Sequence, residues 1–258
     1  MNLSRRRSPL LILGISAVAA PGWPPGGLSL SYSVGGKAYP MSRSDILAGV
    51  SNRPIVVLLH GIDGLSELSR PQIESFAGEL DAQGYAVFVP TYFDSNDGTL
   101  TDLSHLDSVA ALRTGRVGEY GKRVAAAVQV ARAEADVDPL RVALVGFSLG
   151  GGLALERAEA STGEVKAVVD FFGYLGSPSI AANAANLPPT LVFHNHADEI
   201  VPASNSKTLM DSLDRTSVPH DVHFLHDEGG LKHHPFKPKG EADEISRLLT
   251  LRWLKKYL

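Results

Sequence analysis

Residues 141–152 read RVALVGFSLGGG, and they carry the strongest indication of the fold class. It opens with an apolar run, 141–145, of the kind found in strands that are buried on both faces of a parallel sheet. A G-x-S-x-G motif, residues 146–150, follows directly, and a helix is predicted over 149–160. A serine on a sharp strand-to-helix turn, flanked by small residues, presents its Oγ at the end of the sheet. The stretch therefore predicts an α/β protein with Ser148 as a candidate nucleophile.

The alternation of strand and helix continues on both sides of this stretch. Strands are predicted over 28–34, 37–41, 55–59, 85–90, 165–171, 190–194 and 221–225. Helices are predicted from a Ser69–Gln72 capping box to Gly84, and over 113–135, 203–215 and 241–257. This order predicts a mostly parallel central sheet with helices on both faces, preceded by an antiparallel hairpin that turns at Gly35-Gly36. In such sheets ligands bind at the carboxyl ends of the strands.

Composition narrows the class of protein. The chain has 258 residues, of which 44% are hydrophobic and 20% charged, as in ordinary globular domains. A formal charge of −4 disfavours nucleic acid as a partner. The absence of cysteine excludes disulfides, thiolate metal sites and a cysteine nucleophile.

The N-terminus has the pattern of a secretory signal peptide. Arg5, Arg6 and Arg7 precede an apolar run over 10–20 that ends in small residues, and cleavage is expected after Ala19. Residues 20–27, which contain GWPPGG, are expected to form a linker before a catalytic domain at 28–258. Export by the general or the twin-arginine route then gives a periplasmic or secreted protein with no stable membrane anchor. An uncleaved anchor and a frayed cytosolic terminus are the alternatives. Losing three arginines would leave 21 basic against 28 acidic residues, a charge of −7.

A serine nucleophile requires a base, and the base requires an orienting acid. In this topology the chain order is serine, acid, histidine. Asp198 follows the strand at 190–194 and is preferred to Glu199, because it stands nearer the strand end. A surface carboxylate in the turn is the alternative interpretation.

The base is expected after the last strand, where five histidines occur. These are His220, His223, His226, His233 and His234. The first three lie before, within or directly at the end of the strand, which leaves His233 and His234 in the loop that returns over the site. A metal site is the competing interpretation of the five histidines, but their spacing is not that of a recognised zinc motif.

Taken together, these motifs resemble the α/β-hydrolase fold and, within it, the dienelactone hydrolase family. The resemblance is carried by His60-Gly61, residues 146–150, Asp198 with Val201-Pro202, and His234-Pro235-Phe236. The last of these is similar to the H-x-F around the family's catalytic histidine, which implies His234 rather than His233 as the base. Dienelactone hydrolases proper use a cysteine where this chain has Ser148, so the resemblance implies a serine esterase relative.

Two backbone amides are expected to hold the oxyanion of a tetrahedral intermediate. One is that of Leu149, directly after the nucleophile, and the other is that of Ile62 in the turn at 60–64. The expected activity is hydrolysis of small carboxylic esters through an acyl-enzyme, without a metal or organic cofactor, by a monomer or small homo-oligomer. The alternatives are a peptidase or amidase of the same fold and a non-catalytic binding protein on the same scaffold.

One acidic segment, residues 93–112, is expected to lie over the site. Its carboxylates are expected to be solvated rather than to act as ligands; they are Asp94, Asp97, Asp102 and Asp107.

Overall fold

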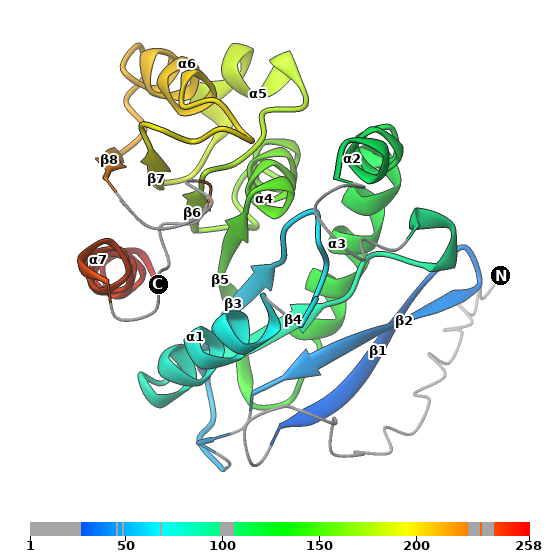
Figure 1. Ribbon diagram of the computed structural model, residues 1–258. Coiled ribbons are helices and arrows are strands. Elements are labelled where there is room, and N and C mark those ends of the chain that lie inside the picture. Colours follow the sequence, from blue (N-terminus) through cyan, green and yellow to red (C-terminus); the bar gives the residue numbers. More distant parts are fainter. Residues whose placement is uncertain are drawn as a thin grey trace, which may run out of the picture.

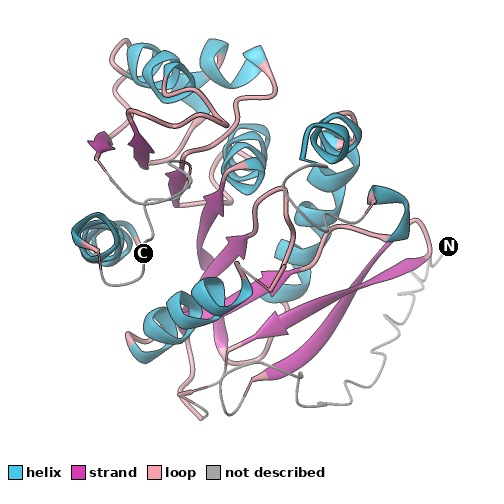
Figure 2. Cartoon of the chain, in the orientation of Figure 1, coloured by secondary structure: helices cyan, strands magenta, loops and turns pink. Residues whose placement is uncertain are grey.

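The computed structural model describes residues 27–258 except 45, 48, 68, 99–105, 227–232 and 234–239. The predicted signal peptide and most of the predicted linker lie outside these residues. The described strands form one eight-stranded sheet in the order β1-β2-β4-β3-β5-β6-β7-β8. Figure 2 shows this sheet as a continuous twisted layer with helices around it.

The N-terminal hairpin forms as predicted. β1 (Leu28–Val34) pairs antiparallel with β2 (Lys37–Arg43), which in turn pairs antiparallel with β4 (Ala86–Pro90). Gly35 and Gly36 have φ of +59° and +79°. Positive φ at both central residues is the requirement of a two-residue type I′ turn, and glycine meets it without steric cost.

All other strand pairs are parallel. β3 (Arg53–Leu59) lies between β4 and β5 (Val137–Phe147), and β6 (Ala167–Phe171), β7 (Thr190–Asn195) and β8 (His220–Leu225) follow in sequence order. The residues of β4, β6 and β7 are buried throughout. These strands are continuous apolar runs because helices cover both of their faces.

Two helical layers enclose the sheet (Figure 1). α3 (Val117–Arg132), α4 (Leu149–Ala160) and α6 (Ser204–Leu213) pack on one face, and α1 (Arg70–Ala82) and α7 (Glu241–Tyr257) pack on the other. Shorter helices are α2 (Leu106–Thr114), α5 (Pro178–Ala182), η1 (Ser95–Asp97) and η3 (Ala184–Asn186). None of the helices described is both long and apolar enough to cross a bilayer. The predicted α/β architecture is confirmed.

Two local predictions were wrong. The helix predicted over 113–135 is divided at Gly115-Arg116, where the amide of Arg116 donates to the carbonyl of Arg113 at 3.0 Å and ends α2. The capping box at Ser69 does not form. Instead, the Ser69 hydroxyl donates to the carbonyl of Gly64 at 3.0 Å, which ties the start of α1 to the loop after β3.

Candidate active site

Ser148 occupies a strained turn at the centre of the sheet. It separates β5 from α4 with φ +55° and ψ −117°, a conformation that L-residues rarely adopt. Its amide donates to the carbonyl of Phe171 at 2.9 Å, and its carbonyl accepts from the amides of Gly151 at 2.9 Å and Tyr174 at 3.2 Å. The surrounding backbone therefore holds the serine in this conformation.

The glycines around Ser148 are required by close backbone contacts. A Cβ at Gly146 would lie 2.2 Å from the carbonyl oxygen of Gly150, and one at Gly150 would lie 2.3 Å from that of Leu59. No real Cβ tolerates such distances, so only glycine allows α4 to pack this closely against β3 and β5.

One histidine connects Ser148 to Asp198. His233 lies with Nε2 2.9 Å from the Ser148 Oγ and with Nδ1 2.8 Å from the Asp198 Oδ2. Because a carboxylate accepts, Nδ1 carries the proton, and Nε2 is left to accept the proton of the serine. The His233 ring also packs on Phe172, with ring centroids 4.8 Å apart. This is the arrangement in which a histidine can act as a general base toward a serine.

Asp198 is fixed as an ionised carboxylate. Its Oδ1 accepts from the amides of Ile200 at 2.9 Å and Val201 at 2.8 Å. Burial alone would raise the pKa of Asp198, but its contacts with His194 and His233 outweigh burial and hold the pKa well below its usual range.

The histidine in this position is His233 and not the His234 that the family motif favoured. His234 lies outside the described residues. The ring of His233 is turned toward Ser148. His233 therefore replaces His234 as the candidate base.

The other histidines near the last strand contact residues outside the Ser148 site. His220 lies with Nε2 3.1 Å from the Asp214 carboxylate, His223 stacks on Phe193, and His226 lies against His196. Among the residues that the structure describes, no three His, Asp or Glu side chains converge in a way that could hold a metal ion.

The turn after β3 lies against the serine. A Cβ at Gly61 would be 3.5 Å from that of Ser148. The ring of His60 stacks on Tyr92 with centroids 3.9 Å apart, and its Nδ1 donates to the carbonyl of Gly61 at 2.9 Å. Burial lowers the pKa of His60 to about 4, so this ring is neutral at pH 7. Within the described chain, neither the amide of Ile62 nor that of Leu149 donates to a protein acceptor.

Two carboxylates of the acidic segment after β4 are held in ion pairs rather than solvated. Asp97 is fully buried and pairs with Arg116 and Arg123, while Asp94 pairs with Arg123 at 3.0 Å and Lys37 at 3.0 Å. Asp107 is exposed on α2 as expected, and Asp102 lies outside the described residues. The prediction of a solvated loop was wrong for Asp94 and Asp97, which anchor the segment to α3 as ion pairs.

Sequence reasoning missed two buried ionisable residues beside the site, His194 and Asp170. His194 contacts the same Asp198 oxygen as His233, and Asp170 lies near the carboxyl end of β6. The sequence did contain a signal for Asp170, which is the single carboxylate in the apolar strand 167–171. Burying an unpaired charge costs free energy, so a carboxylate at such a position calls for an explanation.

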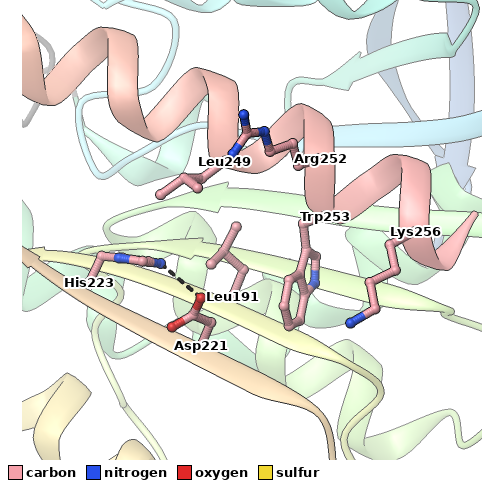
Figure 3. Close-up of a pocket in the computed structure, with 7 residues that line it drawn as sticks. All are labelled: Leu191, Asp221, His223, Leu249, Arg252, Trp253 and Lys256. Atoms are coloured by element: carbon pink, nitrogen blue, oxygen red, sulfur yellow. Dashed lines mark ion pairs between the residues drawn. The ribbon is translucent and has the colours of Figure 1, made fainter.

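A separate pocket of about 160 Å³ lies between β7, β8 and α7 (Figure 3). It is lined by Leu191, Asp221, His223, Leu249, Arg252, Trp253 and Lys256. Leu191 and Asp221 pair near the amino ends of their strands, whereas Ser148 and Asp198 follow the carboxyl ends. This pocket is therefore distinct from the serine site.

A serine on the turn between β5 and α4, an acid after β7 and a histidine after β8 form the arrangement that is typical of the α/β hydrolases. The chain belongs to the dienelactone hydrolase family, whose family model matches residues 46–258. Family membership, which the resemblance had implied, indicates a hydrolase that acts on esters.

Comparison with solved structures confirms the fold. A dienelactone hydrolase-like promiscuous phosphotriesterase from metagenomic libraries is 23% identical with a TM-score of 0.74, covering 90% of this chain and 98% of that one. The dienelactone hydrolase of Anabaena variabilis is also 23% identical, with a TM-score of 0.66 and the same coverage. An acetyl xylan esterase from a Paenibacillus species is 17% identical with a TM-score of 0.65, covering 94% and 88% of the two chains.

Among curated proteins, the quorum-quenching protein AidA of Acinetobacter baumannii is 33% identical over 118 residues. The match spans 45% of this chain and 34% of AidA, so the similarity covers about a third of that protein's length.

Proposed function

We propose that this protein is a serine esterase that cleaves small carboxylic esters through an acyl-enzyme. The observation that carries the proposal is the hydrogen-bonded series in which His233 lies 2.9 Å from the Ser148 Oγ and 2.8 Å from the Asp198 carboxylate. Membership of an ester-hydrolysing family supports the same reaction.

In the proposed reaction His233 takes the hydroxyl proton as the Ser148 Oγ bonds to the acyl carbon. The electron pair of the carbonyl moves onto its oxygen, and this oxyanion accepts hydrogen bonds from the amides of Ile62 and Leu149. The imidazolium of His233, stabilised by Asp198, then protonates the departing alkoxide as the ester bond breaks. Water, deprotonated by His233, attacks the acyl-enzyme and regenerates Ser148.

The test is turnover of a short-chain nitrophenyl ester by four proteins: wild type and the variants Ser148→Ala, His233→Ala and His234→Ala. We expect kcat to fall by about 10⁴-fold or more for Ser148→Ala and His233→Ala, as when a triad member is removed. His234→Ala is expected to stay within about threefold of wild type, well under one power of ten.

A matched control separates chemistry from damage to the fold. Ser31→Ala, on the exposed face of β1, makes the same change far from the site and should leave kcat unchanged. Full activity in Ser148→Ala would overturn the proposal. Loss in His234→Ala with activity retained in His233→Ala would return the base to His234. Turnover of peptide anilides at rates above those of esters would favour a peptidase or amidase.

A further inference from the structure

Asp198 contacts two histidines through a single oxygen. Its Oδ2 lies 2.8 Å from Nδ1 of His233 and 3.4 Å from Nε2 of His194. All three side chains are buried. The carboxylate therefore stands between the proposed base and a second imidazole that has no place in the proposed reaction.

The ring of His194 is held at both nitrogens. Nε2 lies 2.8 Å from the carbonyl of Val201, and Nδ1 lies 2.6 Å from the Ser206 Oγ on α6. A carbonyl can only accept, so Nε2 carries a proton whatever the charge of the ring. This N–H is therefore directed at Val201 with Asp198 beside it, and Ser206 fixes the plane of the ring.

A second carboxyl group faces His194 from β6. Asp170 is 1% exposed, and its Oδ1 has no hydrogen-bond partner among the described residues. Burial raises the pKa of Asp170 to about 7, although the charge of His194 and the amide of Gly173 oppose the shift. Burial would lower the pKa of His194, but Asp198, Val201 and Asp170 together raise it above its ordinary value. The groups facing His194 thus favour its protonated form.

We propose that His194 is a positioning residue for the reaction, acting through Asp198. It contacts Oδ2, the oxygen that also accepts from His233, and in its protonated form it offsets part of the negative charge beside that histidine. This inference rests on the proposed function, since it assigns His194 a role only if His233 acts as the base.

The direction of the effect follows from electrostatics. The groups around His194 favour its protonated form. Replacing that form by a neutral side chain leaves more of the Asp198 charge acting on His233, which favours a protonated His233. A protonated histidine cannot accept the serine proton, so activity is lost at a higher pH than in wild type. The acidic limb of the kcat/KM profile reports this protonation in the free enzyme.

The test is the pH profile of His194→Gln, with thermal unfolding measured in parallel. Glutamine is neutral but retains an N–H donor, so the change removes mainly the charge. We expect kcat to fall about tenfold with KM within about twofold, and the acidic limb to move to higher pH. The downfield ¹H resonance of the His233 Nδ1 proton is expected to shift. A matched control, His220→Gln at the start of β8, should leave kcat and the profile unchanged.

Ser206→Ala provides a second variant in case His194→Gln fails to fold. It removes the partner of Nδ1 without touching Asp198, and a smaller shift of the limb in the same direction is expected. A lower melting temperature with an unchanged pH profile would show a purely structural role and overturn the inference. An unchanged kcat and profile in both variants, while Ser148→Ala is inactive, would also overturn it. Activity in Ser148→Ala would instead overturn the proposed function.

Discussion

Arg113 on α2 donates a hydrogen bond to the carbonyl of Ile62, which lies 51 residues earlier in the chain. The same guanidinium donates to the carbonyls of Asp97 at 3.0 Å and Gly98 at 2.8 Å, and it stacks on the ring of Phe93. One side chain thus joins the turn after β3 to the segment after β4. Since Ile62 is the second proposed oxyanion donor, the position of that donor depends on Arg113.

Replacing Arg113 by methionine should therefore reduce kcat more than it changes KM. Methionine fills similar volume but offers no donor, so the Ile62 turn loses its anchor. We expect about a tenfold fall in kcat, less than the roughly 10²–10³-fold cost of deleting an oxyanion donor outright. Steady-state kinetics on a nitrophenyl ester checks this. Arg132→Met, which removes a guanidinium paired with Glu164 on the outer side of α3, serves as the control. Equal kinetics in the two variants would contradict the prediction.

The buried carboxyl of Asp170 should lower stability at alkaline pH. Its folded pKa of about 7 lies above the ordinary value, so the native state binds more protons than the unfolded chain between about pH 4 and pH 7. The free energy of unfolding therefore falls as pH rises through that window, and the cost persists above it. Asp170→Asn removes the ionisable group.

We expect Asp170→Asn to raise the free energy of unfolding by about 1–2 kcal/mol at pH 8 and to leave it unchanged at pH 4. Urea unfolding at both pH values measures the difference. Asp211→Asn, a carboxyl on α6 paired with Lys207, is the control and should show no such gain. A gain of the same size at both pH values would mean that the effect does not come from ionisation.

Two glycine-to-alanine changes should have opposite effects on stability. In Gly150→Ala the new Cβ would meet the Leu59 carbonyl at 2.3 Å, and we expect a loss of about 3 kcal/mol or more. Gly121 lies inside α3, and no atom lies within 4 Å of the position that a Cβ would take there, so alanine should stabilise the protein by about 0.5–1 kcal/mol. Thermal unfolding of both variants distinguishes these signs, and destabilisation by Gly121→Ala would refute the packing argument.

Export remains a prediction of the N-terminal sequence. If residues 1–19 are a signal peptide, protein recovered outside the cytoplasm of an expressing bacterium should begin at Ala20, as N-terminal sequencing would show. Ala19→Phe should block this processing, because signal peptidases require small residues before the cut. Recovery of the intact chain, starting at Met1, from the cytoplasm alone would argue against export.

The strands and the serine turn could be predicted because local patterns determine them. The helix at 149–160 begins directly after Ser148, since the glycines on both sides leave room for the sharp turn there. The same holds for the hairpin, in which two consecutive glycines leave little alternative.

The features that sequence reasoning missed depend on contacts between distant segments. His233 reaches Ser148 in a contact 85 residues apart in the chain and packs beside Phe172, which no spacing rule contains. Likewise, Asp97 is buried because it pairs with Arg116, which precedes α3, and with Arg123 within α3. Arg123 stands on the apolar face of that helix, a signal that an acidic partner was needed.

The outermost position of β8 in the sheet gives the site two levels of stability. Ser148 follows β5, which has a neighbouring strand on either side, whereas His233 follows β8, which is paired with β7 alone. Local opening of an edge costs less free energy than global unfolding. As the urea concentration rises, esterase activity should therefore disappear before the far-ultraviolet circular dichroism changes. Dilution should restore the activity quickly, because β5 and the Ser148 turn stay folded.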